Sequence, residues 1–130
     1  MIAVDTSALL AIALEEAERD QFTNIIGTNL CIIGATTVME THMLLRQRIG
    51  AEGIEFLENL LARRTVTVIA FDSILLPIAR LAFDRYGRGR HRAGLNFGDC
   101  MAYAIAKANN VPLLFKGNDF ALTDIHSAVA

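Results

Sequence analysis

The segment MIAVDTSALLAIAL, residues 1–14, sets a short apolar run directly before an aspartate and a longer apolar run behind it. Residues 1–5 predict a buried strand, and Asp5, Thr6 and Ser7 offer N-cap side chains for a helix over the rest of the segment. The Asp5 carboxylate therefore stands where a strand ends. In parallel α/β sheets the carboxyl ends of the strands form the edge at which ligands bind.

The rest of the chain repeats this alternation between short apolar runs and helical patterns. Further strands are predicted at 30–33, 65–71 and 111–115, with a last short one near Ile125. Helices are predicted at about 16–26, 36–49, 52–64, 73–86 and 97–109. Strands that alternate with helices of about ten to fifteen residues indicate βαβ units. We therefore expect an α/β fold, a single three-layer domain over residues 1–130 with a central, mostly parallel sheet of roughly four to five strands flanked by helices.

The length and composition of the chain narrow the class of protein. Its 130 residues suffice to bury a core without cross-links, and its apolar fraction of 53% indicates a sheet covered on both faces or a subunit interface. No apolar run reaches the roughly eighteen residues of a membrane helix, and no signal peptide is recognisable, so we expect a cytoplasmic protein without membrane contact. Cys31 and Cys100 lack the spacing of metal or redox motifs and are expected to be buried, reduced thiols.

Four acidic residues stand at the ends of predicted strands or in the first turns of predicted helices: Asp5, Glu40, Asp99 and Asp119. Each position also has a simple structural explanation, because an acid in the first turn of a helix gains about 0.3–1 kcal/mol from the helix dipole. Glu40 stands three residues after Thr37, which is the spacing of a capping box. Asp99 has the same relation to Asn96, and Asp119 fits a plain turn.

Taken together, the four acids are harder to explain by helix capping and turns alone. If the strand ends meet at one edge, two carboxylates about 5 Å apart repel by roughly 3 kcal/mol at an effective dielectric constant near 20, which exceeds the gain from capping. Either the acids lie apart or a cation lies between them. Carboxylate oxygens without a histidine or cysteine set suit Mg²⁺ or Mn²⁺, and such an ion can activate water for phosphodiester cleavage. The sequence leaves open whether one ion binds or two.

Four segments of the chain carry a family resemblance: VDTSAL at 4–9, TTVME at 36–40, LNFGDC at 95–100 and LFKGNDF at 114–120. In order and spacing they are similar to PIN-domain proteins and, more narrowly, to the VapC toxins of bacterial VapBC toxin–antitoxin pairs. The segment RHRAGL at 90–95 resembles one VapC subgroup. The likeness extends over nearly the whole chain, and its most specific part is the third segment followed by the fourth.

The resemblance implies a Mg²⁺- or Mn²⁺-dependent endoribonuclease that blocks translation by cutting RNA. It assigns the acidic pocket to Asp5, Glu40, Asp99 and Asp119. Asp5 and Asp99 would bind the metal. Glu40 and Asp119 would complete the pocket or orient water. Three neighbours would support the pocket through hydrogen bonds: Thr6, Ser7 and Asn96. The resemblance also implies a homodimer and a cognate VapB antitoxin whose C-terminal segment occupies a groove beside the site.

A basic cluster precedes the third of these segments and contains Arg85, Arg88, Arg90 and Arg92. An acidic pocket repels RNA, so cationic side chains must hold the phosphate backbone nearby, and arginine does this with bidentate contacts. Two other interpretations of the cluster stay open: a solvated loop paired with acids elsewhere, or a surface for the antitoxin.

Two other functions for the acids also stay open at this level. An aspartate-based phosphotransfer or phosphatase domain also places an aspartate after its first strand, although Asp5 lacks a second aspartate two residues later. A non-catalytic, dimerising interaction module would use the acids only as helix caps. RNA cleavage that needs Mg²⁺ or Mn²⁺ and stops with EDTA would separate the nuclease from both.

Overall fold

Four short strands build a parallel sheet in the order β3-β2-β1-β4 in the computed structural model, which describes residues 1–129. The strands are β1 (Ile2–Val4), β2 (Cys31–Gly34), β3 (Val66–Ile69) and β4 (Leu113–Leu114). The helices are α1 (Thr6–Ala13), α2 (Arg19–Gly27), α3 (Ala35–Ile49), α4 (Ala51–Leu61), α5 (Leu76–Tyr86), α6 (Phe97–Asn109) and the 3₁₀ helix η1 (Phe120–Leu122). Helices connect each strand to the next, as parallel pairing requires.

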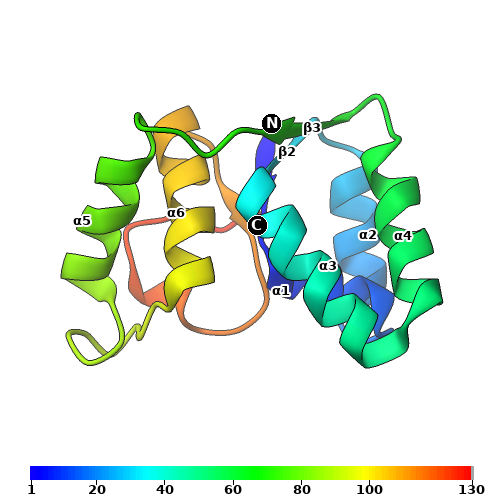
Figure 1. The fold of residues 1–130 in the computed structure, drawn as a ribbon, viewed down its shortest axis with the longest axis horizontal. Helices are drawn as coiled ribbons and strands as arrows, with labels where there is room; N and C mark the ends of the chain where they lie inside the picture. The colour runs from blue at the N-terminus through cyan, green and yellow to red at the C-terminus, as the bar shows by residue number, and fades with distance from the viewer. Residues whose placement is uncertain (130) are drawn as a thin grey trace.

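The sheet lies between two helical layers (Figure 1). On one face, α5 and α6 cover Ala3, Ile32 and Leu113. On the other face, α1, α2 and α4 cover the alternate residues, among them Val4 and Ile33. Helix α3 packs against α1, α4 and α6. The α/β class and the central parallel sheet are confirmed. Strands β1, β2 and β4 are buried on both faces, whereas the edge strand β3 leaves Thr67 and Val68 exposed.

The starts of two helices differ from the sequence prediction. Helix α2 begins at Arg19 rather than near residue 16, because Glu15 takes a left-handed conformation with φ of 55° that interrupts the helical path after α1. Helix α5 begins at Leu76, because the Asp72 carboxylate accepts hydrogen bonds from two following amides and closes a turn ahead of the helix. In both cases a local turn replaces the predicted first turn of the helix.

The final strand predicted near Ile125 is not formed. Within residues 1–129 the sheet has four strands, and the C-terminal segment adds only an isolated bridge between Leu113 and Ser127. The segment still covers one edge of the sheet, because the Leu113 amide donates to the carbonyl of His126 and its carbonyl accepts from the amide of Ala128.

Two expectations drawn from composition can be compared with the structure. Cys31 and Cys100 are buried, free thiols, as predicted. None of the helices within residues 1–129 is long and apolar enough to cross a membrane.

Candidate functional site

Asp5 ends β1 and caps α1 at the carboxyl edge of the sheet. Its amide donates to the carbonyl of Leu114 (2.9 Å), which fixes it against the neighbouring strand β4. Its Oδ2 accepts hydrogen bonds from the amide (3.0 Å) and the hydroxyl (2.6 Å) of Ser7. The residue is only 4% exposed. Asp5 is therefore a buried N-cap in which one carboxylate oxygen is fixed by the protein.

A hydrogen-bond relay connects this cap to the loop after β4. The amide of Lys116 donates to Ser7 Oγ (3.0 Å), and the Ser7 hydroxyl in turn donates to Asp5. Lys116 Nζ lies 3.3 Å from a carboxylate oxygen of Glu16 and 3.3 Å from one of Glu18, so the same loop is also tied to the turn after α1. Sequence analysis did not identify Lys116, because its partner Ser7 is 109 residues away.

Glu40 reaches the same edge from α3. Its Oε1 accepts a hydrogen bond from the Thr6 hydroxyl (2.6 Å), and the Thr41 hydroxyl lies 3.1 Å from that of Thr6. The predicted capping box between Thr37 and Glu40 is wrong, because Gly34 is the N-cap of α3 and no side chain caps this helix. The Glu40 carboxylate is thus held by a residue of α1 rather than by its own helix.

Asp99 lies in the first turn of α6, where the predicted capping box is present. Its amide donates to Asn96 Oδ1 (2.9 Å), and the Asn96 amide donates to Asp99 Oδ2 (3.0 Å). Asp119 stands immediately before η1, is exposed, and makes no side-chain hydrogen bond to any residue of the described range 1–129. Of the four predicted acids, Asp119 is therefore the one whose position is least fixed.

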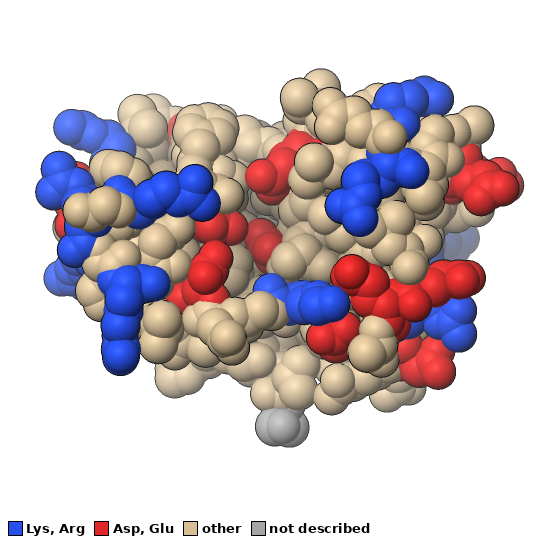
Figure 2. Space-filling view, turned by 90° about the horizontal axis from the view of Figure 1, so that it is seen from below, with Lys and Arg blue, Asp and Glu red and all other residues tan. Residues whose placement is uncertain are grey.

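The charges of these acids influence one another. Burial raises the pKa of Asp5 to about 7; the hydrogen bonds from Ser7 oppose this rise, and the charges of Asp99 and Glu40 add to it. Burial also raises the pKa of Asp99; a backbone hydrogen bond opposes the rise, and the charges of Asp119 and Glu40 add to it. Figure 2, which views the molecule from below relative to Figure 1, shows acidic side chains gathered in the hollow between the two halves of the surface. The folded chain thus brings the four predicted acids within electrostatic reach of one another.

The donor chemistry of this edge fits a hard divalent cation. Asp5, Glu40 and Asp99 each use one carboxylate oxygen for a hydrogen bond within the protein, and the other oxygen of each has no such bond to residues 1–129. Over the same range no three histidine, cysteine, aspartate or glutamate side chains are grouped so that they could hold a metal ion together. Mg²⁺ usually keeps several waters and binds through one or two carboxylates and substrate phosphates. The edge therefore suits a hydrated ion rather than one enclosed by protein ligands.

The predicted basic cluster spans the end of α5 and the loop before α6, and its Arg85 lines a separate groove with Tyr103 and Lys107. The charge of Arg88 partly opposes the rise in the pKa of Asp99 that burial causes. The guanidinium of Arg90 lies over the ring of Phe83, 5.6 Å from its centroid. Within the described chain, neither these two residues nor Arg85 or Arg92 forms a salt bridge. The cluster is therefore not neutralised by acids elsewhere in the fold.

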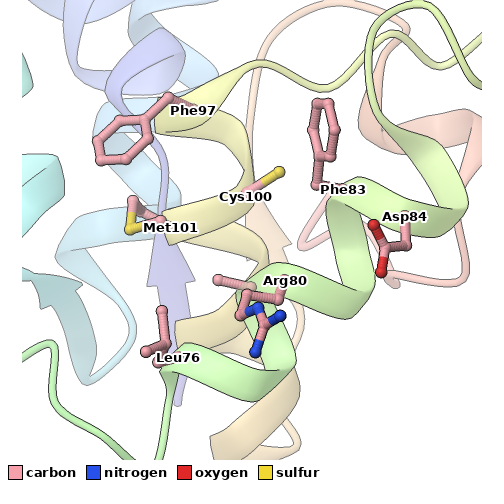
Figure 3. A pocket seen from close by; sticks show the side chains of 8 residues that line it. Leu76, Arg80, Phe83, Asp84, Phe97, Cys100 and Met101 are labelled. Carbon is pink, nitrogen blue, oxygen red and sulfur yellow. The ribbon is translucent and has the colours of Figure 1, made fainter.

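Two apolar grooves open beside the acids and share Phe97, which is 76% exposed. One lies between α5 and α6 and has a volume of about 410 Å³, with Leu76 and Phe83 among its lining side chains (Figure 3). The other lies between α3 and α6, has a volume of about 480 Å³, and includes Glu40 and Gly98. Five exposed apolar residues line the grooves and are called the Phe97 face below: Met39, Met43, Leu76, Phe83 and Phe97.

The PIN domain family matches residues 2–125 of this chain. A ribonuclease VapC of Mycolicibacterium smegmatis is 42% identical over 123 residues, which cover 94% of this chain and 95% of the relative. Ribonuclease VapC30 of Mycobacterium tuberculosis is 39% identical over 123 residues and 94% of both chains. The chain belongs to the PIN-domain family and, within it, to the VapC ribonucleases.

A solved structure has the same fold. Mycobacterium tuberculosis VapC20, described as a sarcin–ricin loop cleaving toxin, matches with a TM-score of 0.79 and 17% sequence identity, and the match covers 96% of each chain. At this identity the likeness concerns the fold alone. The resemblance and the ribonuclease activity inferred from the sequence are confirmed by the family and its relatives. The phosphotransfer alternative has no counterpart among these relatives.

Proposed function

We propose that this ribonuclease is the toxin of a VapBC pair and cuts RNA internally at the carboxyl edge of the sheet, with Asp5, Glu40, Asp99 and Asp119 as its acidic pocket. The observation that carries the proposal is the pattern of hydrogen bonds on three of these carboxylates. One oxygen of each is held by Ser7, Thr6 or Asn96, and the other is free of protein hydrogen bonds in residues 1–129. Helix capping alone does not account for Glu40, because this residue caps no helix.

A Mg²⁺ or Mn²⁺ ion is the cofactor that this pocket suits. Asp5 and Asp99 are proposed to bind it directly, with Glu40 and Asp119 completing the pocket through water. When bound, the ion screens the phosphate charge and lowers the pKa of a coordinated water. The residues of the chain supply the rest: Ser7, Thr6 and Asn96 orient the carboxylates. Burial raises the pKa of Asp5 to about 7, and a bound cation would favour its ionised form.

The RNA backbone needs cationic partners near the acids. Arg88 is the best candidate, because its charge acts on Asp99 and it forms no salt bridge within residues 1–129. The contact with the RNA backbone would be extended along the RNA chain by Arg85, Arg90 and Arg92. The sarcin–ricin loop is the target named for VapC20, and a relative that shares only the fold does not transfer its target to this chain.

The partners follow from the family and from the exposed apolar surface. The VapC names of the relatives imply a cognate VapB antitoxin, and we propose that it blocks access to the acidic edge. The Phe97 face is proposed as the homodimer interface, because contiguous exposed apolar side chains mark protein–protein contact sites. Location in the cytoplasm stays a prediction.

The direct test of the site is the Asp99→Asn substitution. Asparagine can still accept the hydrogen bond from Asn96, so the capping box and the fold should be retained while the negative charge is lost. We expect RNA cleavage in Mn²⁺ or Mg²⁺ to disappear, as it should for the wild type in EDTA. Asp72→Asn is the matched control, because Asp72 also accepts amide hydrogen bonds ahead of a helix but belongs to no predicted site. Cleavage by a clean preparation of Asp99→Asn would defeat the assignment.

A further inference from the structure

Gly98 is an unexpected residue in the first turn of α6, between the N-cap Asn96 and the acid Asp99. Glycine is unfavourable inside a helix because it loses more backbone freedom on folding than any other residue. The backbone does not require it, since the glycines with positive φ are Gly50, Gly89, Gly94 and Gly117. The reason for a glycine at 98 must therefore lie in the space that a side chain would fill.

That space is occupied by the Glu40 carboxylate. A Cβ placed on Gly98 would lie 2.6 Å from Glu40 Cδ and 2.7 Å from Oε1, and closer still to Oε2. All three of its nearest atoms belong to this one carboxylate. The same group accepts the hydrogen bond from the Thr6 hydroxyl through Oε1. The carboxylate is thus confined between Thr6 of α1 and the bare backbone of α6.

We infer that Gly98 is a positioning residue: its missing side chain lets Glu40 place its carboxylate against the first turn of α6, beside Asp99. The positive end of the helix dipole favours a carboxylate there. The inference rests on the proposed function, in which Glu40 belongs to the acidic pocket. It assigns to Gly98 a role in the geometry of the site rather than in the stability of the fold.

The glycines of other helices provide the contrast. Gly53 in α4 faces Leu45, and an added Cβ would lie 2.8 Å from Leu45 Cβ and 3.0 Å from the Leu45 carbonyl oxygen. Those atoms cannot yield, so this glycine serves the packing of α4 on α3. Gly27, the last residue of α2, has nothing within 4 Å of the added Cβ. Gly98 alone of the three meets the flexible end of a side chain, which can move at little cost to the fold.

The test compares three glycine-to-alanine variants. Gly98→Ala should keep or raise Tm, yet lower single-turnover RNA cleavage by about 100-fold, because a misplacement of about 1 Å at a reacting centre has an effect of that order. Its Tm should also rise less than that of the wild type when Mn²⁺ is added, which reports binding without cleavage. Gly27→Ala should match the wild type in cleavage and in the Mn²⁺ response. Gly53→Ala should lower Tm and leave cleavage by the folded protein unchanged.

A second background separates positioning from a general effect on the helix. Glu40→Asp shortens the side chain and frees the space beside residue 98, so adding Gly98→Ala to Glu40→Asp should lower cleavage far less than it does in the wild type. An equal loss in both backgrounds would overturn the inference, and so would wild-type cleavage by Gly98→Ala. Glu40→Gln tests the premise separately. If Glu40→Gln cleaves normally, the role proposed for Glu40 fails, whereas an inactive Glu40→Gln beside an active Gly98→Ala rejects only the inference.

Discussion

Replacement of Asp5 by asparagine removes the most deeply buried charge of the acidic edge but keeps an oxygen that can accept the hydrogen bonds from Ser7. In the wild type, burial raises the pKa of Asp5 from 3.8 to about 7. The folded protein therefore holds this proton more tightly than the unfolded chain does. The resulting stabilisation is complete below about pH 4 and is lost as the pH rises through the folded pKa near 7.

The size of the loss follows from the rise in pKa. A rise from 3.8 to about 7 corresponds to about 4 kcal/mol, at about 1.36 kcal/mol for each pKa unit. Between roughly pH 4.5 and pH 8 the wild type should lose most of this amount through Asp5, whereas Asp5→Asn has no proton to release. Since a typical domain is stable by only about 5–15 kcal/mol, the effect is large. Without divalent ions, Asp5→Asn should be the more stable protein at neutral pH.

Urea unfolding in EDTA over this pH range gives the free energy of unfolding of both proteins. The difference between them isolates Asp5, because the titration of distant groups cancels. Asp72→Asn should follow the wild type at every pH, because the Asp72 carboxylate makes comparable amide hydrogen bonds but is exposed. Adding Mn²⁺ at about 100 times its Kd should stabilise the wild type by about 2.7 kcal/mol, and Asp5→Asn by less. A difference between Asp5→Asn and the wild type that stays constant with pH would refute the assigned pKa.

Three further experiments test other parts of the protein. Thr6→Val removes the hydroxyl that holds Glu40 and should slow cleavage about tenfold or more, since a hydrogen bond to a charged group is worth about 1.5–3 kcal/mol. Thr6→Ser keeps the hydroxyl and should retain activity. Equal rates for the two variants would contradict the role of Thr6 in holding Glu40. Replacing Arg88, Arg90 and Arg92 together by glutamine should flatten the slope of log K for RNA binding against log salt concentration by about 0.7 per lost phosphate contact. An unchanged slope would exclude these arginines from RNA contact. Phe97→Asp should shift the mass measured by light scattering from dimer to monomer, whereas the equally exposed Ile74→Asp should not; a dimeric Phe97→Asp would place the interface elsewhere.

The parts of the site that sequence analysis predicted are those that depend on neighbours in the chain. The Asp5 cap of α1 and the Asn96–Asp99 capping box each join residues no more than three positions apart, so the residue types alone indicate them. The partner of Glu40 could not be found in this way. Thr6 and Glu40 are 34 residues apart, and they meet only because β1 and β2 are neighbours in the sheet, which brings α1 beside α3.

The fold was predictable in its class and less so in the limits of its elements. The strand predicted at 65–71 extends only over Val66–Ile69, because β3 is an edge strand whose one partner, β2, offers four residues for pairing. Beyond that pairing Ala70 is exposed and Phe71 is half-buried against the core. A hydrophobic pattern cannot distinguish such a segment from a strand. For the same reason the apolar pattern near Ile125 predicted a strand, where the structure has only an isolated bridge between Leu113 and Ser127.

Capping and metal binding first stood as competing explanations of the acids, but a carboxylate has two oxygens and can serve both. Asp5 and Asp99 each satisfy a helix N-terminus through Oδ2, which fixes the direction of Oδ1. The Glu40 carboxylate is likewise fixed in direction, by the hydrogen bond from Thr6 and by the space that Gly98 leaves. Because the amide of asparagine preserves the cap and removes only the charge, aspartate-to-asparagine changes separate the two roles where alanine changes would remove both. Stability that is unchanged or increased, together with lost cleavage, is therefore the combination that capping alone cannot produce.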